Sequence, residues 1–124
     1  MASKNGNRII AIEEHYLDPE IVAQYDVKTG FAGTPIRTKM EDLYDLRIKD
    51  MDASGIDIQV LSQGAPGVQR FEPDQAVSLA KAANDRLYET CQQHPDRFAG
   101  FATMASPAPE AAADELERTV KDYG

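Results

Sequence analysis

The chain has 124 residues, of which 42% are hydrophobic and 27% are charged, which suits one folded domain with a core. With 13 Lys and Arg against 21 Asp and Glu, the net charge of −8 disfavours nucleic acids and anionic membrane surfaces as partners. One cysteine cannot form an intrachain disulfide, no apolar run approaches the ~20 residues of a membrane span, and no apolar signal-peptide core is present. We therefore expect a cytoplasmic protein.

Strand and helix patterns alternate through the first half of the chain. Residues 8–12 are short and β-branched, as is typical of a strand, and they run directly into Glu-Glu-His-Tyr. Residues 17–40 hold two prolines and two glycines, which predict at most a short helix over 19–25 and then irregular chain. Apolar side chains at helical spacing predict a helix over 41–53, with Gly55 as its stop.

The second half repeats this order. It predicts a strand, the longest helix and a third strand, over residues 56–61, 74–93 and 98–103. Ser106 and Pro107 then offer a helix N-cap and a first-turn proline, although Pro109 leaves the start of the last helix open. The buried face expected for that helix consists of Ala112, Leu116, Val120 and Tyr123.

This order of elements indicates the fold class. Strands that alternate with helices through short connections are typical of a parallel sheet, because parallel neighbours cannot be joined by hairpins. The sequence therefore predicts an α/β fold. No internal repeat or domain boundary interrupts residues 1–124, so we expect one structural unit.

Acidic and histidine side chains stand where the first strand ends, at the edge that carries the binding sites of parallel α/β folds. Alternation predicts one face formed by Ile9, Ala11, Glu13 and His15, and the other by Ile10, Ile12 and Glu14. The Glu13 carboxylate and the His15 imidazole can bind one divalent ion at about 2.0–2.2 Å, which suits zinc or manganese better than calcium. On spacing alone, a solvated strand end without a metal is the more common interpretation of so short a motif.

Longer segments carry a family resemblance. Residues 8–16, with an Ile-Ala-Ile-Glu-Glu-His core, resemble the first strand of the amidohydrolase superfamily, in the branch of metal-dependent aromatic-acid decarboxylases that includes the dihydroxybenzoate (γ-resorcylate) decarboxylases. Further segments resemble that branch in the same order, at residues 45–56, 61–69, 83–85 and 95–102. The resemblance implies a (β/α)8 TIM barrel in which Glu13 and His15 bind the metal and Glu14 points toward the outer helices.

The resemblance also implies a substrate pocket at the mouth of the barrel. Ser62 and Ala65, in the loop after the second strand, are expected to line it, although the same loop fits an ordinary Gly/Pro turn. Tyr16 and Phe31 could contribute apolar side chains to the wall of this pocket, and packing in the core explains these two residues equally well. The substrate that the resemblance implies is a hydroxylated aromatic or related carboxylic acid.

A complete barrel of this kind has ~250 residues, so residues 1–124 correspond to its N-terminal portion, the first three of eight β/α units. The His and Asp ligands and the proton-handling Asp that the family takes from later strands have no counterpart here. No catalytic residue can therefore be assigned. We expect metal-dependent decarboxylation in the complete barrel and no activity from the 124 residues alone.

Two alternatives stay open. The same metal can activate water, so the fold also fits a hydrolase or hydratase of a ring or lactone. Three strands leave unpaired edges, so the chain also fits a non-catalytic fragment or split subunit that associates with itself or with a complementary half barrel. A homo-oligomer is expected, with a small aromatic carboxylate as the ligand.

Two remaining reactive side chains have plainer interpretations. Cys91 lies on the apolar stripe of the helix over 74–93 and is interpreted as a small core residue, not as a nucleophile. His94 ends the same helix before Pro95, where the helix dipole favours it, so it is not expected to be a ligand.

Overall fold

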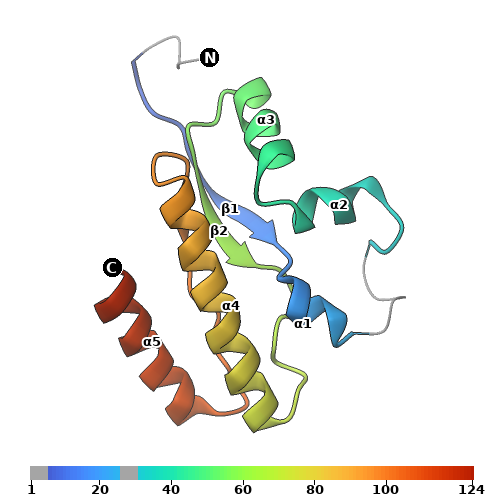
Figure 1. Cartoon of the computed structure of the whole chain (residues 1–124), viewed down its shortest axis with the longest axis vertical. Coiled ribbons are helices and arrows are strands. Elements are labelled where there is room, and N and C mark those ends of the chain that lie inside the picture. The colour runs from blue at the N-terminus through green and yellow to red at the C-terminus, as the bar shows by residue number, and fades with distance from the viewer. Residues whose placement is uncertain (1–5, 26–30) are drawn as a thin grey trace.

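The computed structural model describes residues 6–25 and 31–124. In this part of the chain, three parallel strands form one sheet in the order β1-β2-β3, with β1 at Ile10–Tyr16, β2 at Ile58–Gln63 and β3 at Phe98–Gly100. The accompanying helices are α1 (Pro19–Ala23), α2 (Pro35–Glu41), α3 (Asp45–Ser54), α4 (Pro73–Gln93) and α5 (Pro109–Tyr123) (Figure 1). The predicted α/β class with a parallel sheet is confirmed.

Helices cover one face of the sheet. A core cluster joins Tyr16 of β1, Leu61 of β2 and Phe98 of β3 to Met51 of α3 and Leu87 of α4. Each of these side chains is at most 4% exposed, and burial of one such side chain stabilises the fold by ~1.5–3 kcal/mol. Because the three strand residues all face the helices, the alternate residues of each strand face the opposite side of the sheet, called the open face below.

A second core cluster lies at the carboxyl ends of the strands. It joins α1 and the loop after β2 to the first half of α4, through Ile21, Val68, Ala76, Ala80, Ala83 and Ala105. In Figure 1 the arrowheads of β1 and β2 point toward α1, so this cluster supports the end of the sheet where the candidate site lies.

The strands differ from the predicted ranges at their ends. β1 begins at Ile10 and continues to Tyr16, so Glu13 and His15 belong to the strand itself. β2 begins two residues later than predicted. Gly55, at a φ of 71°, ends α3, and the Ile56 N–H still donates to the Met51 carbonyl in the last turn of that helix. β3 stops at Gly100 instead of reaching residue 103.

Two helical predictions for the first half of the chain need correction. α2 occupies part of the segment expected to be irregular, with Pro35 in its first turn. The helix predicted over 41–53 is interrupted, because the Asp42 carboxylate accepts the N–H groups of Tyr44 and Arg47 at 3.1 and 3.0 Å and starts α3 afresh. Residues 26–30 of the same segment lie outside the described residues.

The helix α4 agrees with its predicted range of 74–93 to within one residue. It begins with Pro73 in its first turn and ends at the predicted His94-Pro95 stop. Neither α4 nor any other described helix combines the length and the apolar character that crossing a membrane requires.

The buried face predicted for α5 is wrong at Leu116 and Val120, whereas Ala112 and Tyr123 are half-buried. Leu116 and Val120 are 51% and 62% exposed, whereas Thr119 is buried. The helix instead turns polar side chains toward α4: Glu115 accepts a hydrogen bond from Asn84 at 2.8 Å. It also begins at Pro109, so Ser106-Pro107 is a turn and not the helix start.

Candidate functional site

An irregularity in β1 sets which side chains reach the open face of the sheet. Ala11 pairs with Gln59, whereas Glu14 pairs with Leu61, so β1 carries one residue more than β2 between these pairs. Such a β-bulge re-aims side chains and is common beside functional sites. Because Gln59 is buried on the helix side, Ala11 beside it faces the helices as well.

The bulge changes the predicted alternation before residue 13 and leaves it intact afterwards. Ala11 is not on the face of Glu13 and His15, contrary to the prediction. Ile10 and Ile12 were predicted on the face opposite Glu13 and His15, but they lie on the open face with exposed fractions of 53% and 64%. Ile12 and Glu13 are the two bulged residues, opposite the single residue Val60, and His15 follows the bulge. Glu13 and His15 are both exposed, and their two-residue spacing puts both on the open face. The two candidate ligands are therefore neighbours.

A hydrogen bond holds the His15 ring. His15 pairs with Ser62 in the sheet register, and its Nδ1 lies 2.9 Å from Ser62 Oγ. This bond engages Nδ1 and leaves Nε2 as the nitrogen for an ion. Ser62 therefore contacts the candidate ligand directly.

The neighbouring Glu14 points the other way, toward the outer helices, as the sequence predicts. Its Oε2 accepts a hydrogen bond from Gln59 Nε2 at 3.0 Å, and Gln59 Oε1 accepts one from Arg47 of α3 at 3.1 Å. A second N–H of Arg47 donates to the His15 carbonyl at 3.1 Å. The backbone of the candidate ligand is thus tied to α3.

Sequence analysis missed Arg47. It is 8% exposed, and burial lowers the pKa of its guanidinium, while Glu14, Asp42 and Asp50 act in the opposite direction. Its position between Tyr44 and Met51, on the apolar stripe of the predicted helix, is the signal that could have found it.

A second missed residue, Asp18, ties the ends of β1 and β2 to the helices. Its buried carboxylate accepts the N–H groups of the first turn of α1 and both N–H groups of the Arg86 fork at 2.8 Å. Its own N–H donates to Gln63 Oε1 at 2.8 Å. The sequence signal is the Asp18-Pro19-Glu20 start of a helix.

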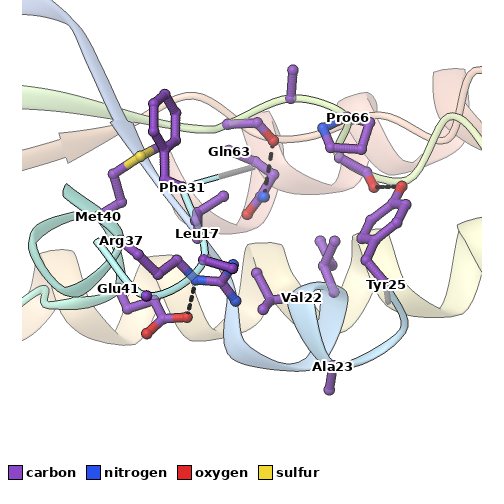
Figure 2. Close-up of a pocket in the computed structure, with 16 residues that line it drawn as sticks. Leu17, Val22, Ala23, Tyr25, Phe31, Arg37, Met40, Glu41, Gln63 and Pro66 are labelled. Atoms are coloured by element: carbon purple, nitrogen blue, oxygen red, sulfur yellow. Dashed lines mark hydrogen bonds and ion pairs between the residues drawn. The ribbon is translucent and has the colours of Figure 1, made fainter. Parts of the chain in front are cut away.

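An apolar cavity of about 430 Å³ opens beside the ends of β1 and β2 (Figure 2). Ala65 and Phe31 line it together with Leu17 and Met40, and an ion pair between Arg37 and Glu41 forms part of its wall. Ser62 is not among the lining residues. The two residues predicted to contact substrate are therefore separated: Ala65 borders the cavity and Ser62 contacts His15.

Tyr16, Cys91 and His94 do not contribute to the open face. Tyr16 is 2% exposed in the helix-side core, so its packing interpretation holds, and burial is the main cause that raises its pKa. Cys91 packs against the same core, and burial raises the pKa of its thiol. His94 caps α4 and contacts the Phe98 ring edge-on, with 5.7 Å between centroids.

Glu13 and His15 form a pair of donors and not a complete metal site. In residues 6–25 and 31–124, no group of three or more His, Cys, Asp or Glu side chains could hold an ion. A carboxylate and an imidazole on one rigid strand suit a first-row divalent metal, and a catalytic ion requires at least one further protein ligand.

The family model described as Amidohydrolase matches residues 15–124, which include His15, Ser62 and Ala65. The chain belongs to the amidohydrolase family. The resemblance of the sequence segments to this family is confirmed.

The curated relatives of this amidohydrolase chain include decarboxylases. Gamma-resorcylate decarboxylase of Rhodococcus jostii (strain RHA1) is 41% identical over 120 residues, which are 93% of this chain and 36% of that protein. This amidohydrolase chain therefore spans about a third of the length of the curated relatives it matches.

Solved structures agree with the fold. Dihydroxybenzoic acid decarboxylase of Polaromonas sp. JS666, with bound manganese and 2-nitroresorcinol, has a TM-score of 0.83 and 38% identity over 95% of this chain and 36% of that one. The 5-carboxyvanillate decarboxylase of Novosphingobium aromaticivorans DSM 12444, complexed with manganese, has a TM-score of 0.87 and 34% identity over 98% of this chain and 40% of that one. These neighbours are TIM barrels, so the amidohydrolase chain described here is a partial barrel, as predicted.

Proposed function

We propose that residues 1–124 are the N-terminal portion of an amidohydrolase barrel that decarboxylates a hydroxylated aromatic carboxylic acid with a divalent metal ion. The observation that carries the proposal is the pair Glu13 and His15, side by side on the open face of β1. This pair stands in a fold that matches decarboxylases solved with manganese at TM-scores of 0.83 and 0.87. The active form is the complete barrel.

In this proposal Glu13 supplies a carboxylate oxygen and His15 supplies Nε2 to the metal. Manganese is favoured over zinc, because the matching decarboxylases hold manganese and the oxygen and nitrogen donors accept either metal. When bound, the ion supplies charge stabilisation and orients the substrate. The remaining ligands and the proton-handling acid come from beyond these residues.

The substrate side of the proposal rests on the cavity beside the ends of β1 and β2, which Ala65 lines. Its volume of about 430 Å³ suits a small aromatic ring. Ala65 contributes a small side chain to its wall and Phe31 an apolar one. Arg37 on the wall is paired with Glu41, which neutralises its charge. We propose that Ala65 contacts the ring and that Ser62 acts on the substrate site through its contact with the ligand His15.

The proposal extends to assembly and location. We also propose a homo-oligomer, because Leu116 and Val120 of the outer helix α5 are 51% and 62% exposed and favour association with a second copy. The net charge of −8 favours a small-molecule substrate over nucleic acid or an anionic membrane, and the single cysteine fits the cytoplasm.

The test uses the full-length protein that contains these residues, loaded with manganese. Glu13→Gln and His15→Gln are expected to lower bound metal and the rate of carbon dioxide release from 2,6-dihydroxybenzoate by at least ~100-fold, because each removes a ligand. Glu14→Gln is the matched control: its side chain lies out of phase, and it should retain both metal and rate.

Two outcomes would overturn the proposal. A full-length protein that binds no stoichiometric divalent metal lacks the proposed chemistry. A ring-opened product without release of carbon dioxide would assign the site to the hydrolase or hydratase class instead.

A further inference from the structure

Ser62 approaches the candidate ligand His15 from the central strand of the sheet. The two residues are register partners, and the Nδ1 to Oγ distance is 2.9 Å. Their neighbours are paired on both sides, Glu14 with Leu61 and Tyr16 with Gln63. The contact is therefore part of the strand ladder and does not depend on a loop.

The backbone around Ser62 is held on both sides. The Leu61 carbonyl accepts the Phe101 N–H at 2.8 Å, and the Gly64 N–H donates to the Tyr16 carbonyl at 2.7 Å. The Leu61 side chain is fully buried. The backbone therefore fixes the Cβ of Ser62 relative to His15, and the rotamer in the structure puts Oγ 2.9 Å from Nδ1.

The direction of the proton in this bond decides what His15 can do. If Nδ1–H donates to Ser62 Oγ, Nε2 carries a lone pair and can bind a metal ion. If the hydroxyl donates to Nδ1, the ring proton is on Nε2 and opposes ligation. Zinc and manganese sites use the first arrangement, in which an outer partner fixes the tautomer of the ligating histidine.

We propose that Ser62 is a positioning residue that accepts the Nδ1–H of His15, and so fixes the tautomer and the ring orientation in which Nε2 faces a metal ion. This inference deepens the proposed function and rests on it for the identity of the ion. It assigns Ser62 to the histidine and leaves contact with the aromatic ring to Ala65.

The first measurement needs no metal. In the metal-free full-length protein at alkaline pH, where imidazoles are neutral, long-range ¹H–¹⁵N correlation spectra report which ring nitrogen carries the proton. The His15 signals are identified by their loss in His15→Gln. We expect Nδ1–H in the wild type, a shift toward Nε2–H in Ser62→Ala, and a return to Nδ1–H in Ser62→Thr, which retains the hydroxyl.

The second measurement is manganese affinity. Loss of an outer-shell partner typically weakens metal binding ~10–100-fold, so Ser62→Ala is expected to fall in that range while Ser62→Thr stays near the wild type. Ser106→Ala, an exposed serine far along the chain, is the control for loss of a hydroxyl. Unchanged thermal unfolding of Ser62→Ala would separate the effect from misfolding.

The outcomes separate the two proposals. Nε2–H in the wild type, or the same tautomer and manganese affinity in Ser62→Ala, overturns the role of Ser62. A wild type that binds no manganese, yet has an Nδ1–H tautomer that Ser62→Ala abolishes, overturns the proposed function and supports the contact between Ser62 and His15.

Discussion

Arg47 brings a positive charge into the layer between α3 and the sheet, directly behind the candidate metal ligand. Its N–H groups donate to Gln59 Oε1 and to the carbonyls of His15, Lys39 and Asp42, at 2.9–3.1 Å. A buried guanidinium with several acceptors is costly to break, because each acceptor loses its partner without regaining water.

Replacement of Arg47 by methionine therefore tests how strongly the site depends on this support. Arg47→Met is expected to lower the free energy of unfolding by ~2–4 kcal/mol, measured by urea denaturation, because it leaves Gln59 and the His15 carbonyl without their donor. Lys49→Met on the exposed side of the same helix is the matched control, with an expected change within ~0.5 kcal/mol. Equal denaturation midpoints for the two variants would contradict the assignment.

At this scale the sequence predicts the candidate ligands and misses the residues that support them. Glu13 and His15 follow from the period of a strand together with the family resemblance. Ser62 beside His15 does not, because the contact depends on the register between two strands that are distant in sequence. The burial of Arg47 was not predicted, because its side chain is charged and buried arginines are rare unless they are paired.

The sequence predicted whether a segment is a helix or a strand better than it predicted the first and last residues of that segment. The two-residue period cannot reveal the bulge in β1, because a bulge adds one residue to one strand only, and this is why Ala11 and Ile10 were assigned to the wrong faces. The start of α3 and the end of β3 are set by side chains that bond the backbone. The Asp42 carboxylate accepts the N–H groups of Tyr44 and Arg47 at the start of α3, and Asn84 bonds both the N–H and the carbonyl of Thr103 beyond β3.

The attachment of α5 to α4 is polar. Arg118 of α5 donates to Asp85 of α4 at 2.7 Å and to Glu115, and Tyr123 stacks on Tyr88 with 4.0 Å between ring centroids. Burial raises the pKa of Asp85, but hydrogen bonds from Tyr123 and Arg118 outweigh it and lower the pKa in sum. Burial likewise raises the pKa of Glu115, and hydrogen bonds from Arg118 and Asn84 lower it in sum.

These shifts predict that the attachment of α5 weakens in acid. A carboxyl whose pKa is lower in the folded state stabilises the fold fully above its ordinary value, here 3.8 for Asp85 and 4.5 for Glu115. That contribution is lost as the pH falls through the folded values. Hydrogen exchange of α5 amides, measured at a series of pH values and corrected for intrinsic rates, is expected to show falling protection in this range relative to α4.

The control for this pH dependence is a change of charge without loss of shape. The double variant Asp85→Asn, Glu115→Gln is expected to show little pH dependence in the protection of α5, whereas Asp122→Asn, an exposed carboxyl on the same helix, should behave like the wild type. A wild-type profile that stays flat through this range would refute the attachment described here.

On the scale of the whole molecule, helices cover one face of the sheet and the other face carries exposed apolar side chains. Ile10 and Ile12 on that face are more than half exposed, and so are Phe101 after β3 and Leu116 and Val120 of α5. The last three line a hollow of about 360 Å³ between β3, α4 and α5. A parallel α/β sheet is normally covered on both faces or closed into a barrel, so this distribution agrees with the partial barrel predicted from the sequence.

The exposed apolar surface predicts that residues 1–124, produced by themselves, self-associate. Sedimentation velocity over a concentration series is expected to show dimers or larger species, because each exposed side chain gains from burial against another copy. The double variant Leu116→Lys, Val120→Lys should weaken association at least ~10-fold, as expected when ~1.4 kcal/mol or more of apolar contact is lost. Ile36→Lys on α2, where the side chain is 50% exposed away from this surface, is the matched control.

A wild-type chain that sediments as a compact monomer at the highest concentration would show that this surface needs no partner, and the proposed homo-oligomer would lose its support.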